Sequence, residues 1–277
     1  MSPSVVTLTI EDNDNATSSN PIDNPGFYVR QHYLDFLNRE PDASGLSFWT
    51  NQITSCGSDA GCIELKRINV SAAFFLSIEF QETGYLVYRM YKAAYANTAN
   101  TLLPVKFNEF LRDTQLVGQG VQVGALDWQT KLETNKQAFA KAFVQRPEFL
   151  QAFPESLSGL GLVSKMELNT HITLSDVERS GLVSMIGMTP ADPEKRATAL
   201  RMVADDDDFR RAEFNSAFVL MQYMGYLRRN PTDPPDNSFS GYLFWLGKLN
   251  SFNGNFVNAD MVKAFIVSGE YRHRFGP

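Results

Sequence analysis

An internal repeat constrains the fold of this 277-residue chain more than any other feature. The segment LNREPDASGLSFW, residues 37–49, has a longer relative, LRRNPTDPPDNSFSGYLFW, at residues 227–245. Both keep Leu, Arg, Pro, Gly, Phe and Trp in the same order. Four positions separate Pro41 from Gly45 and ten separate Pro231 from Gly241, so the second copy carries six extra residues. Internal repetition of this kind indicates a chain assembled from similar structural units.

A second repeated element occurs three times along the chain. It reads AFFLSIEF at residues 73–80, AFVQRPEF at residues 142–149 and AFIVSGEY at residues 264–271, with six positions from Ala to Glu each time. A tryptophan precedes each copy, and these are Trp49, Trp128 and Trp245. The middle copy lacks a clear Arg–Pro turn. We therefore expect three copies of a Trp-bearing helix followed by this element.

Apolar residues beyond position 26 recur at helical spacing. Val29, Tyr33 and Phe36 illustrate the pattern, whereas strand-like alternation is confined to SVVTLTI at residues 4–10. We predict an all-α fold of repeated helical-bundle units, preceded by a short N-terminal β-strand and linker. The expected domains are the strand and linker at 1–24, a first helical module of two repeat units at 25–153, and a second helical module at 154–277.

Each motif residue has a structural role that its chemistry explains. Pro41 disfavours helix at the residue before it and should end the first helix. Asp42 is a good N-cap, and Gly45 would then be the third residue of the next helix, where it permits close contact between two helices. Phe48 and Trp49 would cover this crossing with aromatic surface. In the second copy the corresponding residues are Pro231, Gly241 and Trp245.

The arginine of the motif requires a partner. Arg39 lies at the end of a predicted helix, where a cation suits the helix dipole, and we expect it to pair with Glu79, the recurring Glu of the second element. Arg229 occupies the same position in the second copy of the motif, so it also requires a partner. The other copies of the recurring Glu are Glu148 and Glu270.

Two cysteines lie close together in CGSDAGC. A local disulfide between Cys56 and Cys62 is expected if the protein is exported, and two free thiols are expected in a cytosolic protein. A zinc site is disfavoured because the three histidines lie far away in the sequence. A bridge across so short a loop would mainly hold the loop in place.

Composition excludes several classes of partner. The chain is 43% hydrophobic, so it can bury a core, and its net charge of −6 argues against nucleic acid binding, which needs a basic surface. No apolar run approaches the roughly 18 residues that a membrane-spanning helix requires. The first residues lack the basic and apolar regions of a signal peptide.

Several patterns have a chemical and a structural interpretation. The three tryptophans could be platforms for sugar rings, but core aromatics are favoured. Asp205 to Asp208 could bind calcium, but a solvated helix junction is favoured, and the acidic run at residues 11–15 supplies too few ligands alone. We predict no metal and no cofactor.

The case for catalysis is weak. His32 is expected on the surface of the first helix, His171 lies in a polar segment and His273 lies in a basic tail. No nucleophile motif or phosphate-binding loop accompanies them, so we predict a protein that is not an enzyme.

The run FYVRQHYLDFLNREPDASGLSFWTNQI, residues 27–53, resembles the bacterial domain of unknown function 4214. That family has a tyrosine-bearing helix, a Leu-x-Arg-x-Pro-Asp turn and Gly-Leu-x-x-Trp. The resemblance covers residues 27–153 and, with the insertion, residues 217–277. It departs from the family where the middle unit lacks the turn and where Thr232 follows Pro231. It implies no catalytic residues. The family is similar to the helical linker domains of phycobilisomes, which are assembly modules, and its members commonly occur in exported proteins.

The opening VVTLTIEDNDN resembles the last strand of a Calx-beta domain, an extracellular sandwich. Both resemblances imply a non-enzymatic interaction or assembly module in a bacterial secreted or cell-surface protein. Its partner would be another protein, or a second copy joined through the strand Val5 to Ile10. The alternative is a carbohydrate-binding module that uses exposed aromatic residues. Solvent exposure of the three tryptophans would separate these two functions.

Overall fold

Helices dominate the part of the chain that the structure, a computed structural model, describes, residues 20–97 and 102–276. Within these residues the structure contains no strand, so the all-α prediction is confirmed there. The predicted strand at Val5–Ile10, its resemblance to a Calx-beta domain and the acidic run at 11–15 lie outside the described residues.

The first copy of the motif joins two helices. After the short 3-10 helix η1 (Pro21–Asp23), α1 (Pro25–Phe36) packs against α2 (Ala43–Thr54) and α3 (Ala60–Leu76). The first helix ends earlier than expected, at Phe36 rather than beside Pro41. Asn38 explains this, because it has the left-handed φ of 55°, which turns the chain away and which asparagine tolerates better than most residues.

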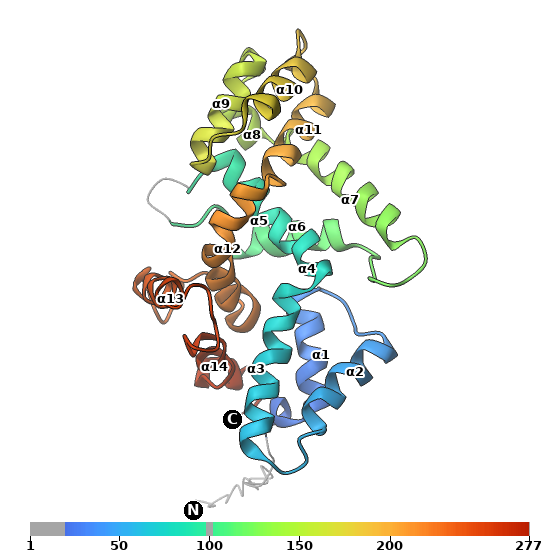
Figure 1. Ribbon diagram of the computed structural model, residues 1–277, viewed down its shortest axis with the longest axis vertical. Coiled ribbons are helices and arrows are strands. Elements are labelled where there is room, and N and C mark those ends of the chain that lie inside the picture. Colours follow the sequence, from blue (N-terminus) through green and yellow to red (C-terminus); the bar gives the residue numbers. More distant parts are fainter. Residues whose placement is uncertain (1–19, 98–101, 277) are drawn as a thin grey trace, which may run out of the picture.

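Helix α5 (Gly84–Tyr95) lies at the centre of the molecule and is buried along nearly its whole length (Figure 1). It contacts elements from before and after it in the sequence. These are α4 (Ile78–Glu82), α6 (Phe107–Gly118), α8 (Pro147–Ala152), α9 (Gly159–Thr170), α11 (Pro193–Ala204) and α12 (Asp207–Met221). Because α5 fills the space between them, it joins the two ends of the elongated molecule.

Helices from both sides of residue 153 pack together in the upper part of Figure 1. There α7 (Trp128–Phe143) contacts α11, and α10 (Asp176–Ile186) contacts α9 and α11. Helices of the two predicted modules, 25–153 and 154–277, therefore contact each other, and the division between the modules stays a prediction.

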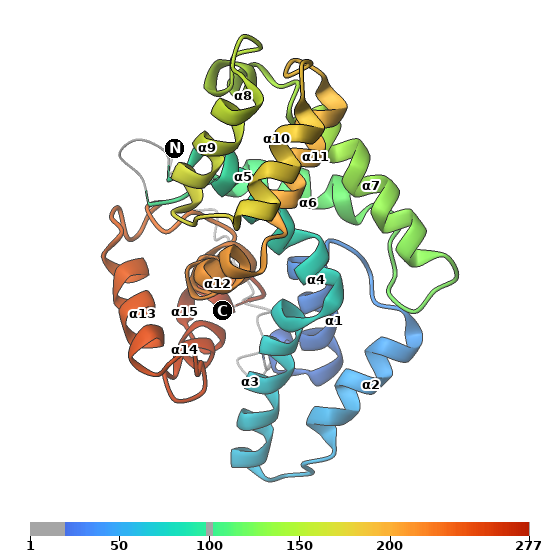
Figure 2. The ribbon, with the colours of Figure 1, turned by 45° about the horizontal axis from the view of Figure 1, so that its top comes forward.

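The segment with the second copy of the motif lies beside the first. The π-helical turn η2 (Gln222–Leu227) continues α12 and contacts α1, and α14 (Met261–Ile266) contacts α3. Helix α13 (Ser240–Ser251) packs on α12, and the short α15 (Gly269–His273) follows α14 (Figure 2).

Both ends of the described chain meet at α15. Asn20 Nδ2 donates to the carbonyls of Arg272 and Gly276 at 3.1 and 3.2 Å. Arg272 donates to both carboxylate oxygens of Asp23 at 2.7 and 2.8 Å. The second motif region is therefore held against the start of the first.

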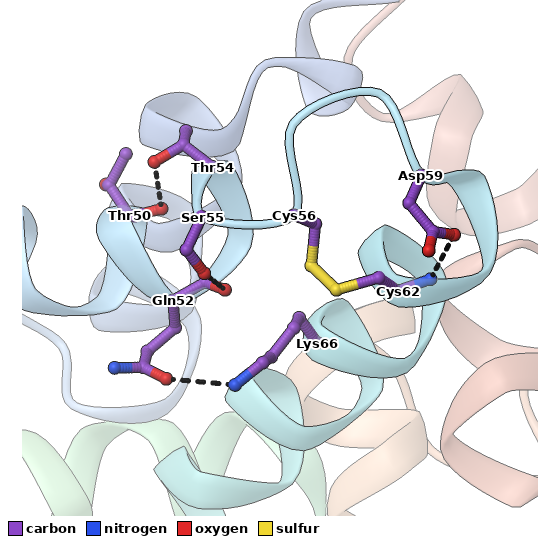
Figure 3. The surroundings of a disulfide bond; sticks show 8 residues. All are labelled: Thr50, Gln52, Thr54, Ser55, Cys56, Asp59, Cys62 and Lys66. Atoms are coloured by element: carbon purple, nitrogen blue, oxygen red, sulfur yellow. Dashed lines mark hydrogen bonds between the residues drawn. A yellow bond between two sulfur atoms is a disulfide. The ribbon is translucent and has the colours of Figure 1, made fainter.

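The predicted disulfide is present between Cys56 and Cys62, whose Cα atoms are 5.6 Å apart. It closes the connection between α2 and α3, as Figure 3 shows. Asp59, inside this loop, caps α3 by accepting from the backbone N–H of Cys62 at 3.0 Å. The bridge and the cap together fix how α3 leaves α2.

Candidate functional site

Two surface pockets lie at the two copies of the motif. The first has a volume of about 310 Å³ and the second about 220 Å³. Each of the ten residues that line the second pocket has a counterpart of the same type in the first. Six of these pairs have polar or indole side chains: Tyr33 and Tyr223, Arg39 and Arg229, Asp42 and Asp236, Trp49 and Trp245, Ser77 and Ser268, Glu79 and Glu270.

The same ion pair forms one wall of each pocket. Arg39 donates from Nε and Nη2 to the two carboxylate oxygens of Glu79 at 2.6 and 2.8 Å, which is the pairing expected from the sequence. Arg229 donates in the same way to Glu270 at 2.5 and 2.9 Å. Bidentate pairing of this kind fixes geometry as well as supplying attraction.

The two ion pairs differ in how their charges are buried, and Arg229 is the more buried arginine, with its side chain 10% exposed against 20% for Arg39. The Glu79 side chain is 7% exposed, whereas the Glu270 side chain is 34% exposed. Each arginine also lies over the tyrosine of its pocket, with the guanidinium carbon 4.9 Å from the Tyr33 ring centre and 5.4 Å from that of Tyr223. Burial raises the pKa of Tyr33, and it raises that of Tyr223 to about 12, so both phenols are protonated at neutral pH.

The motif glycine has the position and the close contact that the sequence predicts. Asp42 caps α2, and its carboxylate accepts from the backbone N–H of Gly45, the third residue of the helix, at 2.7 Å. A Cβ on Gly45 would overlap the Tyr33 hydroxyl, and one on Gly241 would lie 2.6 Å from the Tyr223 hydroxyl. Only glycine lets each tyrosine hydroxyl approach the helix that contains the glycine and tryptophan of the motif, α2 in the first copy and α13 in the second.

The aspartate of the second pocket comes from a different position in the sequence than Asp42 in the first. In the sequence Thr232 stands where Asp42 stands after Pro41, so sequence comparison alone suggests that this acid is lost. In the structure Asp236, one of the six extra residues, accepts from Arg229 Nη2 at 2.8 Å and lines the pocket. Sequence reasoning missed Asp236, although the acidic insertion DPPD was a signal for it.

The aromatic pair of the motif is less buried than expected. Phe48 is 55% exposed and Phe244 is 59% exposed, so the prediction that Phe48 covers the helix crossing is wrong. Each phenylalanine packs edge-on against its neighbouring tryptophan, with ring centres 4.9 Å apart for Trp49 and 5.0 Å apart for Trp245. Trp49 and Trp245 are half-buried at the pocket walls, so they are neither core residues nor open platforms.

The middle copy makes a different ion pair. Glu148 is exposed, and Arg146 instead donates to both carboxylate oxygens of Asp113 at 2.6 and 2.9 Å. Burial alone would raise the pKa of Asp113, but hydrogen bonds from arginines and from Tyr91 outweigh it and hold the pKa below its usual value. Trp128, at the start of α7, is half-buried and lines neither of the two motif pockets.

His32 is buried, which contradicts its expected surface position. Its Nδ1 lies 2.7 Å from the carbonyl of Tyr28 and its Nε2 lies 2.8 Å from Ser71 Oγ, which also contacts the Tyr226 hydroxyl. Burial lowers the pKa of His32 to about 3, so the ring is neutral at pH 7. Because Ser71 and His32 are both enclosed by packing, this hydroxyl–imidazole pair joins α1, α3 and η2 and does not face solvent.

The acidic run at residues 205–208 occupies the junction between α11 and α12. Asp206 caps α12 by accepting from the N–H of Phe209 at 2.8 Å, and Asp205 accepts from the buried Arg89 at 3.0 Å. In the described part of the chain, no three His, Cys, Asp or Glu side chains are grouped so that they could hold a metal ion. Nor does any helix in residues 20–97 or 102–276 combine the length and apolarity needed to cross a membrane.

The structure thus defines an all-helical protein with two similarly lined pockets. Comparison with known families adds one match: residues 14–84 match the family described as "Domain of unknown function (DUF4214)". This segment contains the first motif, its pocket arginine and Glu79, so the resemblance seen in the sequence is confirmed for that part of the chain. No curated protein and no solved structure matches.

Proposed function

We propose that this chain is a non-enzymatic interaction module of a bacterial secreted or cell-surface protein, and that its two motif pockets bind a partner protein. The observation that carries the proposal is the duplication of the pocket lining, together with an exposed phenylalanine packed on the tryptophan of each pocket. The residues that contribute most binding energy at protein interfaces are enriched in Trp, Tyr and Arg, and each pocket contains one of each.

The disulfide supports export. Bridges such as Cys56–Cys62 persist mainly in oxidising compartments and are rare in the cytosol. The Arg–Glu and Gly–Tyr contacts that recur at both motifs support a chain built from repeated helical units. Family resemblance to assembly modules points to the same kind of function.

Site-specific photo-crosslinking tests the proposal directly. A photoreactive phenylalanine analogue is placed at Phe48 or at Phe244 in cells that naturally make the protein, and crosslinked proteins are identified by mass spectrometry. If both pockets bind a partner, the same protein is captured from the two positions.

Leu168 provides the matched control because it is 73% exposed but lies on α9, outside both pockets. The analogue at this position should not capture that partner. Capture of unrelated proteins from the two pockets, or equal capture from Leu168, would contradict the proposal.

Carbohydrate binding is the second candidate. It is favoured by Trp49 and Trp245, which line pockets that also contain an arginine and two carboxylates. A glycan array distinguishes the two functions: a hit that is lost in both Trp49→Ala and Trp245→Ala would favour glycan over protein as the ligand.

Self-assembly through Val5–Ile10 is a further route to partner binding. It is motivated by the alternating, β-branched sequence of this segment, which suits addition to a sheet edge. Light scattering on the chain with residues 1–19 removed tests it, and an unchanged oligomeric mass would rule this route out.

A further inference from the structure

The hydrogen bonds of the second pocket leave its arginine no free donor. Arg229 uses Nε and one Nη2 proton on Glu270, and the other Nη2 proton on Asp236. Its Nη1 group donates to the carbonyls of Asn230 and Asp233 at 3.1 and 3.2 Å. All five guanidinium N–H groups are therefore occupied, so this pocket is poorly suited to an anion.

A carboxylate oxygen remains available in each pocket. Asp42 Oδ1 accepts from the Gly45 N–H and the Ser44 hydroxyl, but Oδ2 accepts no hydrogen bond from the described residues and lies 3.7 Å from Arg39 Nη1. In the second pocket Asp236 Oδ2 accepts from arginine, and within the described chain Oδ1 accepts no hydrogen bond. Each pocket thus has a spare acceptor on a charged group.

The charges on the residues that line each pocket do not cancel. One arginine faces two carboxylates, Glu79 and Asp42 in the first pocket and Glu270 and Asp236 in the second, which leaves one net negative charge in each. An aromatic wall adds a surface that attracts cations. Lys248, which follows Trp245 by three positions in α13 and does not line the pocket, places its ammonium 5.3 Å from this ring centre.

The aspartate is retained without its capping role. Asp42 caps α2, but Asp236 does not cap α13, where the Ser238 hydroxyl accepts from the N–H of Ser240 at 3.3 Å instead. If capping were the only reason for the acid, the second pocket would not need one. A carboxylate supplied from a different position in the sequence points to a requirement of the pocket itself.

We propose that each pocket binds the ammonium or guanidinium group of a basic side chain from a partner protein, with the aspartate as acceptor and the tryptophan beside it. This rests on the proposed function, since it names the chemistry of the partner. Phe48 and Phe244 would contact the apolar residues next to that basic side chain. The net charge of −6 favours encounter with a basic partner.

Indole N–H signals in NMR spectra provide one reporter for each pocket and one internal control. The protein labelled at Trp49, Trp128 and Trp245 is titrated with Nα-acetyl-lysine amide, which carries an ammonium. We expect the signals of Trp49 and Trp245 to shift in a saturable way, while that of Trp128 stays in place. The matched neutral probe is the same compound with its Nε acetylated, and it should shift none of them.

Two charge-neutralising variants assign the effect to the aspartates. Asp42→Asn should raise the dissociation constant at least tenfold for the Trp49 signal alone, and Asp236→Asn should do so for the Trp245 signal alone. Asn also caps helices well, so Asp42→Asn should keep α2 folded. Glu40→Gln removes the same charge from an exposed neighbour that does not line the pocket, and should change neither constant.

The outcomes separate this inference from the proposed function. Equal shifts with the neutral probe, unchanged constants in both Asn variants, or no shift with the ammonium would overturn the assignment of a cation. Shifts with methyl glucoside but not with the ammonium would show that the pockets bind a hydroxylated ligand. A common partner captured from Phe48 and Phe244 would still uphold the interaction module in each of these cases.

Discussion

The two motif pockets share ten lining residues of the same type but differ in how deeply the glutamates of their ion pairs are buried. Glu79, in the first turn of α4, is 7% exposed, whereas Glu270, in the first turn of α15, is 34% exposed. An ion pair that is shielded from water is costly to break on one side, because the remaining charge loses its compensation. We infer that Glu79 depends on its arginine more than Glu270 does, because water can reach the charge of Glu270.

Removing the arginines should give the largest difference between the two regions. We expect Arg39→Met to lower the free energy of unfolding by about 3–5 kcal/mol, since Glu79 would be left buried and unpaired. Arg229→Met should cost about 1–2 kcal/mol, because water can reach Glu270. Urea unfolding measures both changes.

A second substitution controls for lost packing. In the double variant Arg39→Met with Glu79→Gln, the unpaired charge is gone and most of the stability should return. If Arg39→Met and Arg229→Met lower the free energy of unfolding equally, burial of the glutamate does not distinguish the two ion pairs.

The disulfide is a feature of the first region that the second lacks. Residues 252–260 join α13 to α14 without a bridge, whereas Cys56–Cys62 closes the link between α2 and α3. We expect the double variant Cys56→Ser, Cys62→Ser to lose about 2 kcal/mol through the freed loop. The indole signals of Trp49 and Trp245 should stay in place, because neither cysteine lines a pocket. A shifted Trp49 signal would show instead that the bridge positions the first pocket.

His32 offers a third contrast, since Gln222 occupies the corresponding position one residue before the motif tyrosine. Both side chains are buried and contact the carbonyl four residues earlier, 2.7 Å away for His32 and 3.0 Å away for Gln222. Only the imidazole titrates. Its pKa is about 3 in the folded protein but near 6.5 when unfolded, so the unfolded state takes up the proton first as the pH falls.

Stability should therefore decline between pH 6.5 and pH 3, by about 1 kcal/mol at pH 6 and about 2 kcal/mol at pH 5 from this group alone. His32→Gln introduces the residue found at the corresponding position of the second region, Gln222, and should remove this part of the pH dependence of stability. Urea unfolding at pH 7.5, 6 and 5 measures the difference between wild type and variant. Parallel curves for the two proteins would show that His32 is not the titrating group.

Sequence periodicity was enough to predict the all-α fold, and the spacing of the repeat was enough to predict the Arg39–Glu79 pair and the place of Gly45. These features depend on local backbone preferences and on contacts that recur at a fixed spacing. Asp236 could not be placed in this way, because an insertion loop can bring any of its residues to the pocket. Burial of His32 was missed because its surroundings come from α3 and η2, which are distant in sequence.

The exposure of Phe48 was missed for a related reason. Its apolar side chain fits the helical pattern, and nothing in that pattern shows that the surface it occupies has no neighbouring helix. The middle copy shows a related limit: its recurring Glu148 is exposed, and the nearby Arg146 pairs with Asp113 on a different helix. Recurring spacing identified equivalent positions and did not establish equivalent partners.

Substitution of the motif glycines should give the smallest stability difference between the two regions. A Cβ at Gly45 would overlap the Tyr33 hydroxyl, and one at Gly241 would press on that of Tyr223. Overpacking should outweigh the gain in helix propensity, so we expect Gly45→Ala to lose about 1 kcal/mol and Gly241→Ala to lose less. Gly247, also in a helix, has open space at its Cβ, so Gly247→Ala should be stabilising.

Removing the tyrosine hydroxyl identifies the cause of the loss. Tyr33→Phe leaves room at the hydroxyl position, so Gly45→Ala should cost less in this background than in the wild type, and thermal unfolding of the four proteins gives the coupling. If Gly45→Ala costs the same in both backgrounds, the glycine is not required by the approach of Tyr33. The tyrosine would then have to be held in its pocket by the arginine above its ring, and Tyr223 with the more distant Arg229 would be the less constrained of the two.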